Sequence, residues 1–417
     1  MSFFFLKLFT FVMFFQPVYI FPSLAPIRPY LTSAIIAIVT YFLYINRETK
    51  PFLSNKYTQY FILFIIMQIL SASSIWLRGG LNALFAWLNF IIIFYLITKQ
   101  CTQEKQIRSI IIMVIASIAY LSYYSIENYQ AGTRASGFGW YENANDMVLI
   151  LISVIPLVFY LIESSRYKLM RYIYLGLAGL FAFNIILCGS RQGLLGLAIV
   201  GSISLLFIHG LPKILRTGLM TVLIISIFTT GLSVVLQRDD LEGQISGDAS
   251  SEDRIVQWKA CLRMLRDHPI LGIGPGESVY AMRDYGGVRG LPPHNTLIQV
   301  FAETGIPGGV FFVLFSCYPI WDAWKYFRKK RAESKGHRIL SDAHGEMAYR
   351  YLTFALVGFW TCAFFSNRVQ FSILYVLIAL IVAIQQNIFA GIQSLADMQG
   401  KQANLLNNEI IQPQEVK

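Results

Sequence analysis

The sequence predicts an all-α polytopic membrane protein. Of its 417 residues, 55% are hydrophobic and only 14% are charged. Apolar runs of about 20 residues, the length of a helix that crosses a bilayer, recur along the whole chain. A soluble domain could not bury so many of them. We predict twelve spans, at residues 3–20, 30–46, 57–76, 82–98, 108–125, 146–163, 172–189, 193–209, 215–236, 306–326, 348–365 and 371–390.

The distribution of basic residues predicts the orientation of these spans. Lysine and arginine gather in every second loop, at residues 46–56, 98–108, 163–171, 209–216 and 321–347. By the positive-inside rule these loops are cytoplasmic, and so are both termini. The net charge of +11 is then mostly a signal of membrane orientation. No nucleic-acid partner is needed to explain it.

The chain divides into four predicted regions. Residues 1–236 form the first nine spans, 237–305 a large helical loop on the outer face, 306–394 the last three spans, and 395–417 a disordered cytoplasmic tail. No small-residue cleavage site follows the Phe-rich N-terminal run, so we expect a retained first helix rather than a signal peptide. The cysteines show no CxxC pairing, so neither a disulfide framework nor a metal site is indicated: Cys101, Cys188, Cys261, Cys317 and Cys362.

Each short outer loop carries one arginine and no lysine, against the positive-inside bias. The five arginines are Arg28, Arg78, Arg134, Arg191 and Arg368. A single arginine can simply reach up to the lipid headgroups. Five on one membrane face favour a phosphate-binding set, because the guanidinium offers a fixed bidentate fork and keeps its charge.

Arg191 has the most specific setting of the five. It lies in a Gly-Ser-Arg-Gln-Gly turn, where Gly189 and Gly193 allow a close backbone approach and Ser190 could cap the following helix. An arginine in the first turn of a helix adds its charge to exposed N–H groups, which favours an anion. The alternative is an ordinary turn with a headgroup arginine.

The long outer loop is predicted to contain a helix over residues 251–267. At 100° per residue, Arg254 shares one stripe with four apolar residues, Trp258, Cys261, Leu262 and Leu265. We expect this stripe to face the membrane domain. A buried arginine needs an anion, since desolvation of its charge otherwise costs several kcal/mol. A salt bridge to Glu277 or Asp284 could supply it, and we favour a substrate phosphate.

The second half of this loop contains His294. Three glycines between residues 272 and 276 match neither GxGxxG nor P-loop spacing, so we expect a turn that packs the loop helix against the membrane domain. Two prolines precede His294, and Asn295 is expected to cap a short helix, Thr296–Thr304, that ends at a Gly-Ile-Pro-Gly-Gly break. Histidine, with an ordinary pKa of about 6.5, can accept a proton from a hydroxyl group. A lone histidine is more often structural, but the neighbouring arginines favour a catalytic base.

These motifs resemble those of the O-antigen ligase/polymerase superfamily of bacterial inner-membrane proteins. The ligases share His-Asn/Ser/Gln, nine residues, then Gly-x-x-Gly, which His294-Asn295 and residues 305–309 fit. An Arg-x-x-x-Leu pattern is matched by residues 191–195, and the run Arg134–Pro156 resembles the Gly…Asn-x-Asn segment that leads into a span. The motifs cover about residues 130–320, and the twelve-span layout covers the rest.

The resemblance implies a GT-C-like membrane glycosyltransferase of the bacterial inner membrane, active at the periplasmic face, with no metal and no cofactor. The donor would be a glycan on undecaprenyl diphosphate, and the acceptor a sugar hydroxyl of lipid A–core or another saccharide. The reaction would invert the anomeric centre. His294 would be the base, and Arg191 and Arg254 would bind the diphosphate. Further substrate contacts would come from Arg28, Arg78, Arg134, Asn295 and Arg368.

Alternatives to an O-antigen ligase stay open. A polymerase of O-antigen or exopolysaccharide shares the topology and the arginines, although the complete histidine–glycine motif and the basic balance of the chain favour a ligase. Related enzymes attach glycans to protein. A flippase or transporter should carry charged residues inside its spans, at mid-depth. Here charges collect at the outer face, which favours chemistry at the membrane surface.

Overall fold

The computed structural model is helical throughout the part of the chain that it describes, which comprises residues 1–44, 51–131, 133–208, 212–221, 225, 251–288, 290–333 and 343–389. The helices at the N-terminal side are α1 (Ser2–Phe15), α2 (Pro17–Ile20), α3 (Pro29–Leu43), α4 (Lys56–Ile75), α5 (Leu77–Gln100), α6 (Glu104–Glu127), α7 (Ala144–Ser164), α8 (Lys168–Leu187) and α9 (Arg191–Phe207). Those that follow are α11 (Ser251–Asp267), α12 (Ser278–Ala281), α13 (Thr296–Ser316), α14 (Tyr318–Glu333), α15 (Ala343–Ala363) and α16 (Ser372–Ala383). The predicted all-α class is confirmed.

Seven helices of the described segments are long and apolar enough to cross a membrane. They are α4, α5, α6, α7, α8, α13 continued by α14, and α16 with the π-helical turn that follows it. Three shorter apolar helices, α1, α3 and α9, accompany them. The count of twelve spans and the orientation of the chain stay predictions.

The positions of the predicted spans agree well with the helices. Every predicted span overlaps a helix. Of the ninth, 215–236, the structure describes residues 215–221 and 225, which are helical, and the tail 395–417 lies outside the described residues. The span 306–326 lies within the apolar helical stretch Thr296–Arg331. The first span was wrong in detail: residues 3–20 are not a single helix, because α1 ends at Phe15 and α2 begins at Pro17.

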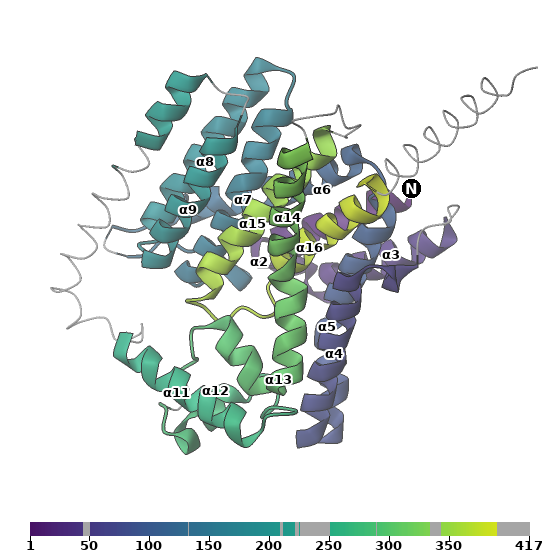
Figure 1. Cartoon of the computed structure of the whole chain (residues 1–417), viewed down its shortest axis with the longest axis vertical. Helices are drawn as coiled ribbons and strands as arrows, with labels where there is room; N and C mark the ends of the chain where they lie inside the picture. Colours follow the sequence, from purple (N-terminus) through teal and green to yellow (C-terminus); the bar gives the residue numbers. More distant parts are fainter. Residues whose placement is uncertain are drawn as a thin grey trace, which may run out of the picture.

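The core of the molecule is built around α7 and α16. Nearly every side chain of α7 is buried, and every side chain of α16 is. Helix α7 packs against α8, α9 and α15 (Figure 1). Because α7 is apolar on all sides, it can be surrounded by other helices, whereas a helix with one apolar face could not. Its first turn is therefore held rigidly by its neighbours.

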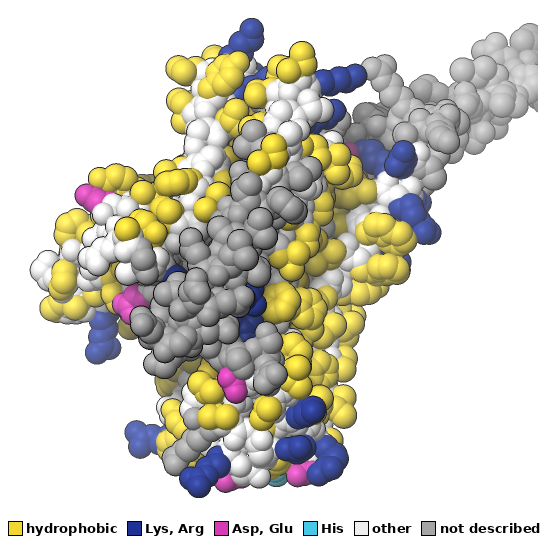
Figure 2. All heavy atoms as spheres, turned by 90° about the vertical axis from the view of Figure 1, so that its left-hand side faces the viewer, with side chains coloured by type: hydrophobic (Ala, Val, Ile, Leu, Met, Phe, Trp, Pro, Cys, Tyr) yellow, Lys and Arg dark blue, Asp and Glu magenta, His cyan; other side chains and the backbone are white. Residues whose placement is uncertain are grey.

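The outside of the bundle suits a lipid environment. Helix α3 exposes Ile35, Val39 and Phe42, and α8 exposes Leu169 and Ile173. Figure 2 shows hydrophobic side chains over the middle of one face, with Lys and Arg side chains gathered at its upper and lower ends. This distribution is typical of a protein that presents an apolar band to the hydrocarbon of a bilayer.

Helices α11 and α12 lie together at one end of the molecule, which we call the loop end (Figure 1). The glycine-rich turn between them packs against the membrane helices, as the sequence predicted. Gly272, Gly274 and Gly276 all have positive φ. The backbone N–H of Gly274 donates to the carbonyl of Glu303 in α13 (3.0 Å), and a Cβ at position 274 would lie 2.0 Å from Ile75 in α4.

Helix α11 confirms the predicted range, but its buried face differs from the expected stripe. Cys261 is buried, whereas Leu262 is 54% exposed, so Leu262 was wrongly assigned to the packed face. The fully buried positions of α11 are Gln257, Ala260, Cys261 and Met264. The two faces are about 100° apart around the helix, the rotation of one residue. Which face is buried depends on the segments that α11 packs against, and the hydrophobic pattern alone does not reveal these.

A kink divides α13 at Gly305, as the Gly-Ile-Pro-Gly-Gly sequence predicted. The φ of Gly305 is 72° and its ψ is −176°, a conformation that favours glycine. The backbone N–H of Ile306, which the kink removes from the helix ladder, donates to the carbonyl of Pro269 at 2.8 Å. The start of the second part of α13 is thereby tied to the segment that follows α11.

The contact of α9 with α7 predicts a stability difference between two glycine variants. A Cβ at Gly193 would lie 2.8 Å from Cγ1 of Val148, a β-branched side chain that cannot easily move aside. Gly193→Ala should therefore destabilise the fold by about 1–3 kcal/mol. Gly179→Ala in α8, which meets nothing within 4 Å, is the matched control. Thermal unfolding of the detergent-solubilised protein measures both, and equal midpoints would contradict the packing.

Candidate functional site at the loop end

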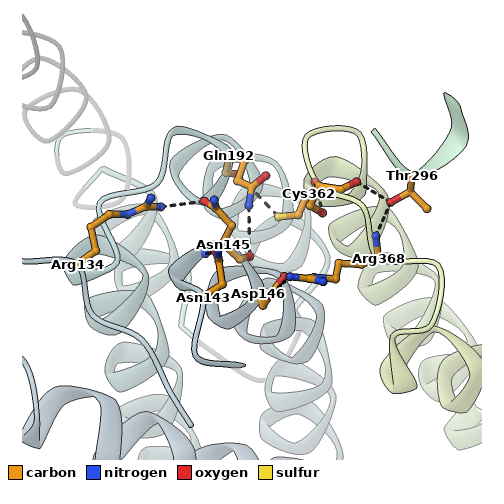
Figure 3. Close-up of polar contacts among 9 residues, drawn as sticks. Arg134, Asn143, Asn145, Asp146, Gln192, Thr296, Cys362 and Arg368 are labelled. Carbon is orange, nitrogen blue, oxygen red and sulfur yellow. Dashed lines mark hydrogen bonds and ion pairs between the residues drawn. The ribbon is translucent and has the colours of Figure 1, made fainter. Parts of the chain in front are cut away.

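The side chain of Asn145 joins three segments at the start of α7. Its Oδ1 atom accepts a hydrogen bond from Nη2 of Arg134 (2.8 Å) (Figure 3) and another from the hydroxyl of Ser190 (2.9 Å). Nε of Arg134 also donates to the carbonyl of Cys188 at 2.9 Å. Asn143 caps α7 by accepting from the N–H of Asn145 (2.8 Å). The loop before α7 and the turn before α9 are thus held against each other.

This arrangement corrects the role expected for Ser190. Ser190 is the N-cap residue of α9, but its side chain makes no capping hydrogen bond. Its hydroxyl donates to Asn145 instead, because the two segments meet there. The close approach expected at Gly193 is confirmed by its contact with Val148. Arg191 follows at the first position of α9, and its side chain is exposed at the loop end.

Arg368 and Asp146 form a bidentate ion pair between the loop after α15 and the first turn of α7. Nε and Nη2 of Arg368 donate to the two carboxylate oxygens of Asp146 (Figure 3). The Asp146 side chain is only 4% exposed and that of Arg368 is 36% exposed. The backbone N–H of Arg368 donates to the hydroxyl of Thr296 (3.0 Å), which itself donates to the carbonyl of Ser366 (2.7 Å).

His294 lies two residues before Thr296, in a backbone conformation that is rare for its residue type. Its φ is 47°, in the left-handed region, and its side chain is half-buried. Conformations of this kind cost free energy and concentrate at functional sites. The expected cap is confirmed, because the side chain of Asn295 accepts from the N–H of Ile298 (3.0 Å). The histidine is thus held between a turn and a capped helix.

Helix α11 is tied to the same segment. The indole N–H of Trp258 donates to the carbonyl of Pro293, next to His294, at 2.7 Å. Arg254 lies one helical turn before Trp258 and is half-buried. Burial raises the pKa of the Cys261 thiol on this helix to about 12. This thiol stays protonated at neutral pH and is a poor candidate for a nucleophile.

The five outer arginines fall into two groups around the start of α7. Arg134 lies on one side, at Asn145, and Arg368 lies on the other (Figure 3). Arg191 follows Ser190, which also contacts Asn145. Arg28 and Arg78 are exposed and lie next to residues that line a cavity on the Arg368 side. None of these contacts includes a substrate, so the five binding roles and that of Asn295 stay predictions.

That cavity has a volume of about 840 Å³. Its walls come from α3, α4, α5, the turn before α7 that carries Trp140, the glycine-rich turn, the first part of α13 and the loop that carries Arg368. Aromatic side chains and amide side chains both line it. Neither His294 nor Arg191 nor Arg254 belongs to its lining, so it is a compartment beside the predicted catalytic residues.

Two residues at the centre of this arrangement, Asn145 and Asp146, were missed as site residues. Both lie in the Asn-Ala-Asn-Asp run before α7, where asparagines can cap a helix and an aspartate suits its first turn. This run was the sequence signal that could have indicated a polar site at the start of α7. It does not reveal that Asp146 meets Arg368, because the two are 222 residues apart in the chain.

Comparison with known proteins agrees with the predicted resemblance. Residues 176–313 match the model of the O-Antigen ligase family. The matched region contains Arg191, Arg254 and His294, the three residues predicted to be catalytic. Arg134, Asp146 and Arg368 lie outside it.

Two curated proteins are similar to the chain. A "Putative polysaccharide ligase" of Rickettsia felis is 24% identical over 274 residues, 60% of this chain and 63% of the relative. A protein of the same printed name from Rickettsia conorii is 24% identical over 245 residues, 55% of this chain and 56% of the relative. The similarity thus spans less than two thirds of either relative.

Within the described segments, no three His, Cys, Asp or Glu side chains gather in a way that could hold a metal ion.

The predicted resemblance itself is confirmed: this helical membrane chain resembles the O-antigen ligase superfamily, with residues 176–313 matching its ligase family.

Proposed function

We propose that this protein is a glycosyltransferase of the O-antigen ligase type. It transfers a glycan from undecaprenyl diphosphate to a sugar hydroxyl of lipid A–core at the periplasmic face of the inner membrane. The acceptor oxygen forms a bond to the anomeric carbon while the bond from that carbon to the phosphate oxygen breaks. The anomeric centre inverts, the proton of the hydroxyl passes to a base, and the electron pair leaves on the diphosphate.

One observation supports this proposal: a series of contacts connects the segments that carry the predicted catalytic residues. Arg134 and Ser190 meet at Asn145, and the next residue, Asp146, pairs with Arg368. The backbone of Arg368 donates to Thr296, two residues beyond His294. The Trp258–Pro293 hydrogen bond adds the helix that carries Arg254. A base and several cations brought to one end of a membrane bundle suit transfer from a lipid diphosphate.

Each predicted residue has a defined task in this reaction. His294 accepts the proton of the acceptor hydroxyl as that oxygen attacks. Arg191 and Arg254 bind the diphosphate and stabilise the negative charge that builds on it. A lipid diphosphate is a good leaving group, so the reaction needs no general acid. The apolar surface of the bundle accommodates the polyprenyl chain.

The surface glycolipids of a strain that lacks the gene test the reaction class. Bare lipid A–core, together with long glycan accumulated on undecaprenyl diphosphate, is the expected result. Core that carries a single repeat, with the long chains absent, would instead identify a polymerase. An unchanged glycolipid profile would contradict both assignments and would direct the search to exopolysaccharide or protein acceptors.

His294→Asn should lower the transfer rate by about 10²–10⁴-fold, the usual contribution of a general base. Asparagine tolerates the left-handed backbone of residue 294, so the fold should survive the change. The matched control is His268→Asn, whose ring contacts Tyr285 (3.2 Å) in the same outer segment and has no role in the reaction. Transfer from a purified lipid-linked glycan measures both. Full transfer activity of His294→Asn would exclude His294 as the base.

Arg191→Lys tests whether the contact with the diphosphate is bidentate. Lysine keeps the charge but cannot donate two parallel N–H bonds, so we expect the KM for the donor to rise about tenfold. Arg283→Lys is the control, because Arg283 is also exposed in the outer segment but lies outside the proposed machinery. Equal donor KM values for wild type and Arg191→Lys would show that a single charge is enough at this position.

A further inference from the structure

The cavity beside Arg368 combines aromatic rings with hydrogen-bonding side chains. Trp76 and Trp140 line it and are 52% and 43% exposed, and the ring of Trp140 meets that of Tyr30 edge-to-face at 5.5 Å. Asn89 and Gln299 line it as well. Flat apolar rings alongside amides suit a sugar, which presents C–H groups on its faces and hydroxyls around its rim.

Two acceptor atoms of this lining make no hydrogen bond within the described residues. Oδ1 of Asn89 and Oε1 of Gln299 are both buried and without a donor. A buried acceptor that lacks a donor costs about 1–3 kcal/mol, so two of them at one cavity need an explanation. Both residues line the cavity, so a saccharide that fills it and draws either acceptor atom towards its surface would supply the missing donor.

The wall that carries Gln299 is rigid. Its amide N–H donates to the carboxylate of Glu303 (3.0 Å), which also accepts from the hydroxyl of Ser278 (2.6 Å) in the outer segment. The backbone of Gly274 is bonded to the carbonyl of Glu303. The acceptor atom of Gln299 is therefore held in place before any ligand arrives, which lowers the entropy cost of binding.

The chemistry of the lining argues against a polyprenyl chain or a phosphate as the occupant. An apolar chain would leave the amides and the carboxylate of Glu277 without partners. The carboxylates of Glu277 and Glu303 in the lining would repel a phosphate. Arg368 is the cation of the lining, and two of its N–H groups already donate to Asp146. A hydroxyl-rich saccharide matches both the rings and the polar groups.

The position of the cavity distinguishes the two saccharides of the reaction. The Arg368–Asp146 pair lies between the cavity and the side that carries Arg134 and Arg191, where the donor diphosphate is proposed to bind. His294 is connected to this boundary through Thr296. A base at the boundary could take a proton from a hydroxyl on the cavity side as that oxygen attacks a donor on the other side.

We propose that this cavity is the binding site of the acceptor saccharide. That the bound saccharide is the acceptor rests on the proposed transferase function. The binding of a saccharide to the cavity can be measured without turnover. Trp76 and Trp140 pack on the faces of its sugar rings, and Asn89 and Gln299 accept hydrogen bonds from its hydroxyls.

The test measures binding of phosphate-free core oligosaccharide, prepared from the bacterium that encodes the chain, to the full-length protein in nanodiscs without donor. Trp140→Ala and Asn89→Leu should each weaken this binding by about tenfold. Trp324→Ala is the matched control, because Trp324 is 47% exposed on α14 and does not line the cavity. If Asn89→Leu fails to fold, Trp76→Ala replaces it, because Trp76 is a second exposed ring of the lining.

Steady-state transfer separates the two saccharides. The cavity variants should raise the KM for the acceptor and leave the KM for the lipid-linked donor unchanged. A rise in the donor KM alone would overturn the assignment to the acceptor, and unchanged core binding by Trp140→Ala and Asn89→Leu would overturn the saccharide site. Competition by a polyprenyl phosphate in place of the oligosaccharide would identify the cavity as a lipid site and would also overturn it.

These outcomes do not depend on the proposed base. If His294→Asn retained full transfer while Trp140→Ala lost core binding, the proposed mechanism would fail and the saccharide site would stand. If His294→Asn abolished transfer and the cavity variants bound core normally, the reverse would hold.

Discussion

The ion pair between Asp146 and Arg368 is the interaction on which the loop end depends. Asp146 stands at the first turn of the most buried helix, and Arg368 comes from the loop that connects two other core helices. Removal of Arg368 would leave the carboxylate of Asp146 buried and unpaired, at a cost of about 3–5 kcal/mol. The same pair fixes the backbone that holds Thr296 and divides the loop end into two compartments. The packing of the helices, the pairing of these charges and the proposed chemistry therefore all depend on this ion pair.

Most of the helical fold could be predicted because its signals are local. Apolar runs located the helices, Asn295 indicated a cap, and Gly305 a break, each through the chemistry of a few neighbouring residues. Errors arose where a distant segment decides the outcome. Leu262 was assigned to the packed face of α11, but the face that is buried there is set by segments such as 285–293, which supply partners for Arg263 and Trp258.

The candidate site was predicted in its charged residues but not in how they are connected. An arginine in each outer loop and a histidine after two prolines can be recognised singly in the sequence. That Asn145 holds Arg134 and Ser190 together could not, since a hydrogen bond between loops leaves no periodic pattern. The cavity was missed for the same reason. Its walls come from segments far apart in the chain that only the packing of the helices brings together.

The distance along the chain between Asp146 and Arg368 has a consequence for biosynthesis. The ribosome makes Asp146 222 residues before its partner, an interval of roughly 10–45 s at ~5–20 residues per second. During this time α7, apolar on every side, can enter the bilayer, but Arg368, the partner of its carboxylate, has not yet been synthesised. Until then we expect Asp146 to stay in the hydrated headgroup layer. The last helices to leave the ribosome then pack against α7 and bury its carboxylate with Arg368.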